Sequence, residues 1–412
     1  MMREEDERLL IETGPGTPLN RFMRGYWIPV LRSVQLVAGG APHRFTVLGA
    51  SYVGFRGLDG RAGVMDEACP HRGASLALAR NEPGGLRCIY HGWKMDVEGR
   101  VREAPTHPEE FHVASLRACA HPVREGQGIV WAWLGGGPAP AFRPLAFTDL
   151  PDDHVMAATL VAHCGWLQPL ETLWDIFHAQ ILHNQTNRNS RRGSVYFSGR
   201  GRTLDNGVNY DYPQTLVEAT PYGFVHSNVD AIKRTHFRFI APFIQHHTLE
   251  PGATADKGLQ ISVPIDDEHT LLWMVFYNRT GPLAPDGFAM RGLAGVPDLN
   301  DFMAHLGPRT ADNRWGQNRR AMERGESLSG IVGDTMLTSI FGEDLMAIES
   351  QGIRGRTREQ LAVTDRALAF GRRRLLEMIR EHEAGAPPAG RDLDLTNVEA
   401  VYELQAVEAV PG

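Results

Sequence analysis

Two short motifs of cysteine and histidine constrain this chain more than any other feature. They are Cys69-Pro70-His71 and Cys88-Ile89-Tyr90-His91, and residues 72–87 separate them. Two thiolates and two imidazoles suit a tetrahedral zinc ion as well as an iron–sulfur cluster, so the ligand count alone does not identify the metal. Zinc sites usually pair two cysteines on one arm, whereas each arm here carries one cysteine and one histidine. This spacing favours a [2Fe-2S] cluster with cysteines on one iron and histidines on the other.

The composition excludes several classes of protein. The chain has 412 residues and a formal net charge of -7, and it lacks a basic stripe with interleaved aromatic residues, so we expect no nucleic-acid partner. It has no apolar run of the length that spans a membrane, and residues 1–8 lack the apolar core of a secretory signal. We therefore expect a soluble, cytoplasmic protein without a membrane partner. In that reducing compartment, Cys119 and Cys164 are expected to be small buried apolar residues.

The first third of the chain is typical of a small all-β module. Residues 3–12 predict a short charged helix that ends at Gly14-Pro15-Gly16. From about 40 to 135, short β-rich runs alternate with turn signals such as Asp59-Gly60. The Gly- and Pro-rich stretch 135–140 marks the linker to a second domain.

The second domain is expected to contain a large antiparallel sheet. A strand is expected near 155–163, a helical stretch at about 166–182, a polar loop at 183–192 and a surface loop at 279–300. A final helix should begin after a cap at Thr364 or Asp365 and end at Gly385. Further strands are expected at 194–198, 208–211, 223–228, 234–240, 258–264 and 269–277.

A second group of possible metal ligands lies in the helical stretch. In a continuous helix Glu171, Asp175 and His178 would follow one face at i, i+4 and i+7. His183 would then lie roughly 140° around the helix from His178, so joint ligation needs a break or a wide turn. The alternative is a core histidine followed by a histidine at the end of a helix.

Two histidines and one carboxylate form the facial triad that holds non-haem Fe(II) in oxygenases, and an electron-carrying cluster needs such an acceptor. The carboxylate has to come from far along the chain. The candidates are Asp334, Glu343, Asp344 and Glu349.

From about residue 7 to 383, the chain resembles the phthalate dioxygenase branch of the Rieske non-haem iron oxygenases. The resemblance implies an α+β fold, with an all-β Rieske [2Fe-2S] domain and a catalytic domain whose large antiparallel sheet is covered by helices (helix-grip, START-like). Its boundaries are 1–40 for an N-terminal segment that packs on the catalytic domain, 41–140 for the Rieske domain, 141–385 for the catalytic domain and 386–412 for a tail. The residues that carry it are Thr13-Gly14-Pro15-Gly16-Thr17-Pro18, Arg24-Gly25-Tyr26-Trp27, the block from Asp66 to Pro105, and Trp166-Leu167-Gln168 with Glu171, Asp175, His178, Leu182 and His183.

The resemblance also implies roles for individual residues. The family's carboxylate ligand is the Asp of a Q/E-D pair followed by Glu and Gly, and Glu343-Asp344 with Glu349 and Gly352 fits that frame. Asp175 is implied to bridge a Rieske histidine of one subunit and His178 of the next, in a homotrimer or stacked trimers. Thr172 and Ile176-Phe177 depart from the family's usual glycine and small polar residues, which puts the pocket lining in doubt. The implied ligands are Cys69, His71, Cys88 and His91 for the [2Fe-2S] cluster, and His178, His183 and Asp344 for the mononuclear Fe(II).

The implied function is that of the oxygenase component of a multicomponent system. It would use O2 and two electrons from a separate NAD(P)H-dependent reductase of the flavin or ferredoxin type, since this chain has no nucleotide fingerprint. The reaction would be mono- or cis-dihydroxylation of an aromatic compound, or O- or N-demethylation. A Rieske protein that only carries electrons would leave the second domain without a purpose. A zinc hydrolase would not need the cluster.

Arginines give a weak indication of the substrate. A guanidinium can bind a carboxylate through two hydrogen bonds, and Arg238 on a predicted strand is our candidate for an aromatic carboxylate. Phe177 either narrows the substrate cavity or packs in the core. His236, His246 and His247 are interpreted as structural. Other arginines crowd one segment, where surface or subunit contacts are the alternative: Arg188, Arg191, Arg192, Arg200 and Arg202.

Overall fold

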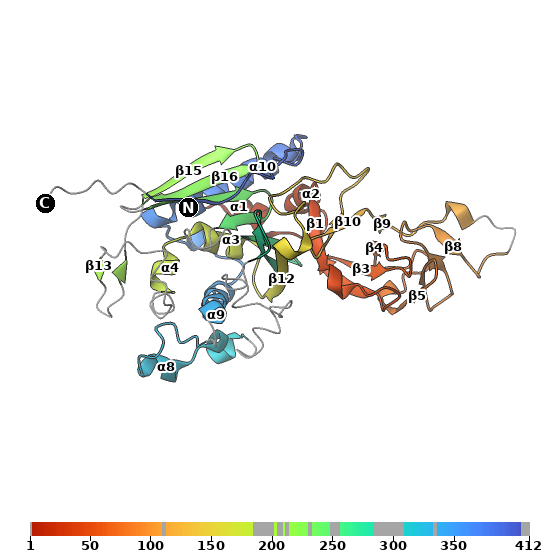
Figure 1. Cartoon of the computed structure of the whole chain (residues 1–412), viewed down its shortest axis with the longest axis horizontal. Coiled ribbons are helices and arrows are strands. Elements are labelled where there is room, and N and C mark those ends of the chain that lie inside the picture. The colour runs from red at the N-terminus through yellow and green to blue at the C-terminus, as the bar shows by residue number, and fades with distance from the viewer. Residues whose placement is uncertain are drawn as a thin grey trace.

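The chain folds into two lobes. The computed structural model describes residues 2–108, 113–183, 202–203, 209–210, 214–229, 233–247, 256–283, 309–332 and 336–404. The smaller lobe, red to orange in Figure 1, contains the Cys/His motifs, and the larger lobe contains the long sheet and most of the helices. Both domain types expected from the sequence are therefore present.

The smaller lobe is built from two four-stranded antiparallel sheets. Its core contains Val53, Phe55, Met65, Leu86 and Met95, which come from facing strands of both sheets. One sheet has the order β2 (His43–Val47), β3 (Ala50–Arg56), β4 (Ala62–Asp66), β9 (Ala120–His121); the other has β5 (Arg80–Glu82), β6 (Gly85–Arg87), β7 (Lys94–Met95), β8 (Val101–Glu103).

A three-stranded sheet lies where the two lobes meet. It has the order β1 (Trp27–Arg32), β11 (Ile129–Trp133), β10 (Val123–Gly126). The chain before β1 forms α1 (Glu4–Ile11) and α2 (Pro18–Met23). Thr17 caps the start of α2, and its hydroxyl accepts a hydrogen bond from the backbone N–H of Asn20. Both helices pack on α10 (Arg366–Glu383) of the larger lobe.

The larger lobe contains an eight-stranded antiparallel sheet. Seven strands follow the order β12-β20-β19-β18-β17-β16-β15, and β21 pairs with β17 beside them. Three strands of this sheet, β15, β18 and β21, were not expected from the sequence, and β21 lies in the stretch 386–412 that was expected to be a tail. The bounds are β12 (Val155–Ala162), β15 (Gln214–Thr220), β16 (Gly223–Val229), β17 (Lys233–Ile240), β18 (Ile244–His247), β19 (Asp256–Pro264), β20 (Thr270–Asn278) and β21 (Val401–Leu404), with the short pair β13 (Arg202–Thr203) and β14 (Asn209–Tyr210) outside the sheet.

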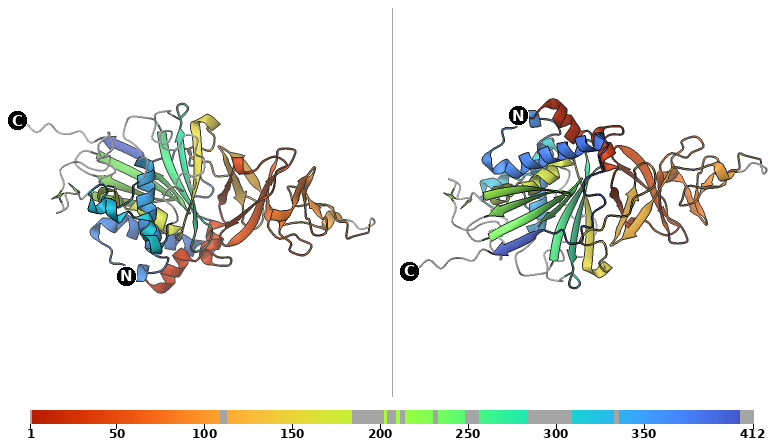
Figure 2. Two further views of the ribbon diagram at one scale, coloured as in Figure 1. Left: turned by 90° about the horizontal axis from the view of Figure 1, so that it is seen from below. Right: turned by 90° about the horizontal axis from the view of Figure 1, so that it is seen from above.

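The two faces of this sheet have different surroundings. Phe224, Phe239 and Gln245 are cross-strand partners in one row, and all three contact Trp174 at the end of α3 (Leu167–Trp174). We call this side the helix face, because α3, α9 (Met336–Ser350) and α10 cover it. The other side, the loop face, carries Tyr277, which packs on Phe147. Figure 2 shows the helices beside the fanned sheet.

The helical stretch expected at 166–182 is broken in two. α3 ends at Trp174, Asp175 has extended backbone angles (φ -95, ψ 94), and α4 covers only His178–Ile181. The Asp175 carboxylate accepts hydrogen bonds from the backbone N–H groups of Phe177 (2.8 Å) and His178 (3.3 Å). A short polar side chain that binds the following backbone in this way competes with helical hydrogen bonds, which explains the break.

The remaining described elements are short. α8 covers Arg319–Glu323, and α10 starts one residue after Asp365, whose carboxylate accepts a hydrogen bond from Ala362. Among the helices in the described ranges, none is long and apolar enough to cross a membrane. Single 3₁₀ turns lie at Ser33–Gln35, Leu76–Leu78, Val113–Ser115, Asp152–His154, Ala311–Gly316, Arg356–Arg358 and Val363–Asp365.

Candidate metal centres

The two Cys/His motifs form a pair of matching turns at one end of the smaller lobe. The carbonyl of Cys69 accepts a hydrogen bond from Gly73 (2.8 Å), and the carbonyl of Cys88 accepts one from Gly92 (3.0 Å). Both glycines have left-handed backbone angles (φ +73 and +75), which a residue with a side chain rarely adopts. Each turn therefore needs its glycine to bring a Cys and a His to the same side.

The four side chains converge. The rings of His71 and His91 are T-shaped with centroids 4.5 Å apart, and Trp93 stacks on His71 at 4.8 Å. The Nδ1 atoms of both histidines are buried and have no hydrogen-bond partner. Burial and the neighbouring Cys88 raise the pKa of the Cys69 thiol to about 11. Two unpartnered ring nitrogens beside two thiols fit a group that brings positive charge, as a [2Fe-2S] cluster does.

A second convergence of ligand atoms lies over the helix face of the large sheet. One ligand atom each from His178, His183 and Asp344 lies within 4.8 Å of the other two. Nε2 of His183 is 3.0 Å from Oδ1 of Asp344, and Nε2 of His178 is 3.4 Å from the same oxygen. The break at Asp175 makes this possible, because it separates α4 from α3 and lets both imidazoles face α9.

The other ring nitrogen of each histidine, Nδ1, already takes part in a hydrogen bond. Nδ1 of His183 lies 2.7 Å from Oε2 of the buried Glu343, and Nδ1 of His178 donates to the backbone carbonyl of Asp175. Both Nε2 lone pairs therefore point towards Oδ1 of Asp344, which is itself buried without a hydrogen-bond donor. Three electron-pair donors facing one point fit a cation.

The charges of this group agree with that geometry. Burial acts against ionisation of Asp344, but the charges and hydrogen bonds of His183 and His178 hold its pKa well below the usual range. Burial likewise acts against protonation of His178, but Asp175 and Asp344 raise its pKa to about 10. A bound cation would take the place of the proton on His178, so cation binding is expected to release that proton.

Of the four carboxylates proposed from the sequence, Asp344 is the one that meets both histidines. Glu343 binds the far side of His183, and its other oxygen accepts a hydrogen bond from Ser329 (2.6 Å). Glu349 forms an ion pair with Arg309 (2.9 Å). Asp334 lies outside the described residues, as do Arg188, Arg191, Arg192 and Arg200.

The expected stripe of Glu171, Asp175 and His178 is wrong, because the helix ends between its members. Glu171 is buried and binds the guanidinium groups of Arg356 (3.2 Å) and Arg372 (2.6 Å) instead. Asp175 stays beside His178, with its Oδ2 atom 3.7 Å from Nδ1.

The structure does not bring Arg238 to this group. Arg238 is a cross-strand partner of His246, whose Nδ1 lies 3.5 Å from the hydroxyl of Tyr277 on the loop face. Side chains of directly paired residues share a face, so Arg238 points away from α9. Phe177, half-buried, precedes α4 directly.

Comparisons with known proteins match this two-part architecture. Residues 26–120 match the model of the Rieske [2Fe-2S] domain, and residues 132–410 match the "LigXa C-terminal domain like" model. The 3-chlorobenzoate-3,4-dioxygenase oxygenase subunit of Comamonas testosteroni is 34% identical over 95% of this chain and 92% of its own length. The chain belongs to the Rieske non-haem iron oxygenases.

Other relatives place this Rieske oxygenase in the phthalate dioxygenase-like branch, as an oxygenase (alpha) subunit. The phthalate 4,5-dioxygenase oxygenase subunit of Pseudomonas putida is 33% identical over 95% of this chain and 89% of its own length. Among solved structures, NdmA of Pseudomonas putida CBB5 has a TM-score of 0.61 at 17% identity and covers 98% of this chain and 99% of its own. Dicamba monooxygenase has a TM-score of 0.57 at 17% identity, covering 89% and 100%. These two structures show the same fold.

A Rieske oxygenase carries a [2Fe-2S] cluster and a mononuclear iron, and it receives electrons from separate partner proteins. Both groups of residues described above fit these cofactors, because each leaves buried donor atoms unpartnered where the metal would bind. Local motifs pointed to the Cys/His pairs and to His178 and His183, and the family resemblance pointed to Asp344, but the hydrogen-bonding role of Glu343 was not predicted. That role depends on the contact between α9 and α4, which no local pattern encodes.

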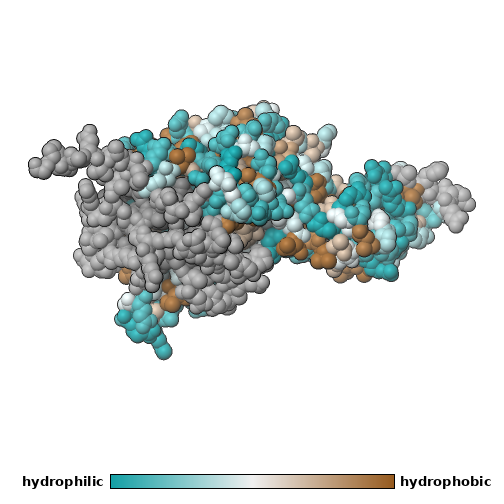
Figure 3. Space-filling view, viewed as in Figure 1, coloured by the Kyte–Doolittle hydropathy of each residue, from teal (hydrophilic) through white to brown (hydrophobic). Residues whose placement is uncertain are grey.

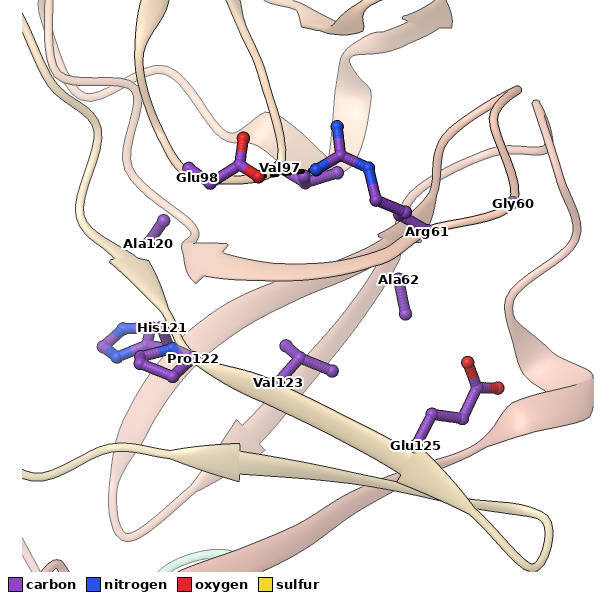
Figure 4. A pocket seen from close by; sticks show the side chains of 10 residues that line it. All are labelled: Gly60, Arg61, Ala62, Val97, Glu98, Ala120, His121, Pro122, Val123 and Glu125. Carbon is purple, nitrogen blue, oxygen red and sulfur yellow. Dashed lines mark hydrogen bonds and ion pairs between the residues drawn. The ribbon is translucent and has the colours of Figure 1, made fainter. Parts of the chain in front are cut away.

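A hollow on the Rieske lobe, drawn in Figure 4, is separate from both centres. It has a volume of about 590 Å³, and an ion pair between Arg61 and Glu98 (2.5 Å) lies on its rim. His121 lines it and binds Asp66 (2.8 Å), with Cys119 beside them. Cys119 is exposed, so the expectation that it is buried was wrong. It directly precedes β9, which lies at the edge of its sheet, whereas Cys164 is buried as expected.

Proposed function

We propose that this Rieske oxygenase hydroxylates an aromatic carboxylate, by mono- or cis-dihydroxylation, with O2 and two electrons from a separate reductase. The observation that carries the proposal is the convergence of His178, His183 and Asp344 in a chain that also contains a Rieske centre. The relatives named for 3-chlorobenzoate and phthalate support an aromatic acid as substrate.

We assign the ligands as follows: Cys69, His71, Cys88 and His91 for the cluster, and His178, His183 and Asp344 for the iron. When bound, the cluster supplies single electrons and the iron supplies the position at which O2 is activated. Glu343 holds a proton on Nδ1 of His183, and the Asp175 carbonyl does the same for His178. Each Nε2 is thereby kept free for the metal.

We assign Asp175 as the bridge between the two centres of neighbouring subunits. Within one chain these centres lie in different lobes, with α4 and β8 far apart in Figure 1. The turn with His91 exposes Ile89 (58%) and Tyr90 (56%), and brown apolar surface is visible on the Rieske lobe in Figure 3. Exposed apolar side chains next to a cluster ligand support a homotrimer or stacked trimers, in which a neighbour covers them.

The electron donor is proposed to be an NAD(P)H-dependent reductase of the flavin or ferredoxin type. A solved structure with the same fold is titled as a complex of an oxygenase with the ferredoxin of carbazole 1,9a-dioxygenase (TM-score 0.56, 17% identity, covering 93% of this chain and 98% of that chain). We propose that the system works in the cytoplasm, because such a donor draws on pyridine nucleotides.

An O-demethylase is the second candidate. The 5,5'-dehydrodivanillate O-demethylase oxygenase subunit of Sphingobium sp. is 26% identical over 94% of this chain and 83% of its own length. A screen of aromatic acids and methoxylated aromatics, coupled to O2 uptake and product analysis, separates the two activities.

The iron assignment is tested with Asp344→Ala. We expect this variant to keep the visible absorption of the cluster and to lose iron from the second centre together with substrate turnover. Retained turnover would contradict the assignment. A purified protein that contains zinc and no labile sulfide would overturn the proposed function altogether.

A further inference from the structure

A group of buried polar side chains lies on the helix face of the large sheet, and neither metal centre uses it. His226 and Asn228 on β16 are 0% and 8% exposed, and Gln245 on β18 is 0% exposed. Only some of the polar atoms in these three side chains have hydrogen-bond partners. Nδ1 of His226 and Nδ2 of Asn228 are buried without a partner. An unpaired buried donor is costly, so these atoms call for an explanation.

The orientation of Gln245 is fixed by Trp174. The indole N–H of Trp174 can only donate, and it lies 3.0 Å from Oε1 of Gln245. The amide nitrogen of Gln245 therefore faces the other way, where it donates to the carbonyl of His246 (3.0 Å) and lies 3.2 Å from Nε2 of His226. Since the amide nitrogen is a donor, Nε2 of His226 must accept, and the ring proton of His226 resides on Nδ1.

His226 is thus a neutral donor. Burial, with a smaller contribution from the charge of Arg238, lowers the pKa of His226 to about 3. The ring stacks on Phe237 with centroids 4.9 Å apart, which holds its plane. Its Nδ1–H group consequently points in a fixed direction and finds no acceptor among the described residues.

Asn228 presents a second donor on the same face. Its Oδ1 accepts a hydrogen bond from the hydroxyl of Thr215 (2.9 Å), which leaves the amide nitrogen for another partner. Residues i and i+2 of a strand lie on one face, about 7 Å apart, so the amide N–H of Asn228 and the Nδ1–H of His226 can both reach one ligand. A third side-chain nitrogen without a partner, Nδ1 of His247, lies two residues beyond Gln245.

This part of the helix face lies on the same side of the sheet as the proposed iron ligands. His247 pairs with Gly258 on β19, and Gly258 pairs with Phe276 on β20. Phe276 belongs to one apolar cluster with Leu345, the residue after Asp344 on α9. His226 and Asn228 are therefore on the face that α3, α9 and α10 cover, whereas Arg238 is on the loop face.

We propose that the Nδ1–H of His226 and the amide N–H of Asn228 bind the carboxylate of the aromatic substrate. The inference rests on the proposed function and replaces Arg238 as the residue that contacts the acid. Two fixed donors without an acceptor match a group that only accepts, and a carboxylate offers two such oxygens. The charge of Arg238 reaches His226 across the sheet and favours an anion there.

The test measures ligand binding to the resting holoenzyme without reductant, so that it does not depend on turnover. The dissociation constants of benzoate and toluene are measured by calorimetry under argon. His226→Phe keeps the stacked ring and removes the donor. We expect it to weaken benzoate binding on the order of ten- to a hundred-fold and to leave toluene binding unchanged. His246→Phe makes the same change on the loop face of the same sheet and should leave both constants unchanged.

A second variant guards against a folding defect. Asn228→Asp keeps the acceptor for Thr215 and puts a carboxylate where the amide donor was, so it should also weaken benzoate selectively. Unchanged benzoate binding in both variants, or an equal loss of benzoate and toluene, would overturn the subsite. So would a wild-type protein that binds toluene as tightly as benzoate. If aromatic acids stimulate O2 uptake while the variants bind normally, only the subsite fails; if no aromatic compound stimulates O2 uptake, the proposed function fails whatever the binding shows.

Discussion

Nδ1 of His183 lies 2.7 Å from Oε2 of Glu343, the residue that precedes Asp344 on α9. Two neighbouring residues of one helix therefore contact opposite nitrogens of the same imidazole. Glu343 fixes the tautomer and the ring plane, and Asp344 faces the nitrogen that is left free. Glu343 is a positioning residue for the proposed iron site.

Replacing Glu343 by Gln should weaken iron binding. The amide still fills the space, but it removes the charge that orients and strengthens the imidazole ligand, and such changes typically cost about 10- to 100-fold in metal affinity. The measurement is a titration of the metal-depleted second centre with Fe(II), with the cluster absorption as an internal standard. Glu349→Gln is the matched control on the same helix: it breaks the buried pair with Arg309 and should lower stability without changing iron affinity. Equal iron affinity in both variants would contradict the role of Glu343.

Asp175→Asn should separate electron transfer from metal binding. The amide oxygen can still accept the hydrogen bonds from Phe177 and His178, so the turn between α3 and α4 and both metal centres are expected to remain. The variant loses the negative charge that we propose couples the centres. We expect a severe fall in the rate at which a prereduced cluster is reoxidised in the presence of substrate and O2, followed by stopped-flow absorbance. An unchanged rate would show that electrons take another route.

Glu171→Gln should destabilise the fold strongly. The carboxylate lies between Arg356 and Arg372, and all three side chains are at most 8% exposed. Removing one charge leaves two buried guanidinium groups under-compensated, and breaking a buried pair in this way costs about 3–5 kcal/mol in the free energy of unfolding. Urea denaturation measures this change in the free energy of unfolding. Glu326→Gln, in an exposed pair with Arg324, is the control and should cause no measurable change.

Protonation of the Glu171 carboxylate should lower the stability of the fold at acidic pH. Burial acts to raise the pKa of Glu171, but the two arginines outweigh it and hold the pKa below the ordinary value of 4.5. A group whose pKa is depressed by folding stabilises the protein above its unfolded pKa, and that contribution is lost as the pH falls through the folded value. The difference in stability between wild type and Glu171→Gln should therefore shrink on acidification below about pH 4.5. A constant difference down to pH 3 would argue against the ionised network.

Cys119 should react slowly with alkylating agents although it is exposed. Partial burial and the charge of Asp66 raise the pKa of its thiol to about 11, so little thiolate exists at pH 8. Asp66→Asn removes the repulsive charge and should speed iodoacetamide labelling at Cys119, read by mass spectrometry. Cys164 is buried and provides the unreactive reference in the same digest. Slower labelling in the variant would mean that Asp66 activates the thiol instead.

Local sequence patterns determined the two ligand motifs, the all-β module and several elements of the second domain. The motifs are readable because a Cys/His turn is closed within six residues by its own backbone, as in Cys69 to Ala74. Helix α10 can be predicted because its apolar residues repeat at the helical period. These signals depend only on neighbours along the chain.

Tertiary structure decided what depends on partners far along the chain. Residue chemistry alone left four carboxylates open, and the family resemblance selected Asp344. Packing of α9 against α4 brings Asp344 and Glu343 to opposite sides of His183. The sequence also left the face of Arg238 open, because a strand's alternation shows which residues share a side but not which side meets the helices. Only the pairing register across β16, β17 and β18 places Arg238 on the loop face and His226 on the helix face. The physical reason is that a residue's chemical surroundings come from contacts across the fold, whereas its local conformation comes from its neighbours.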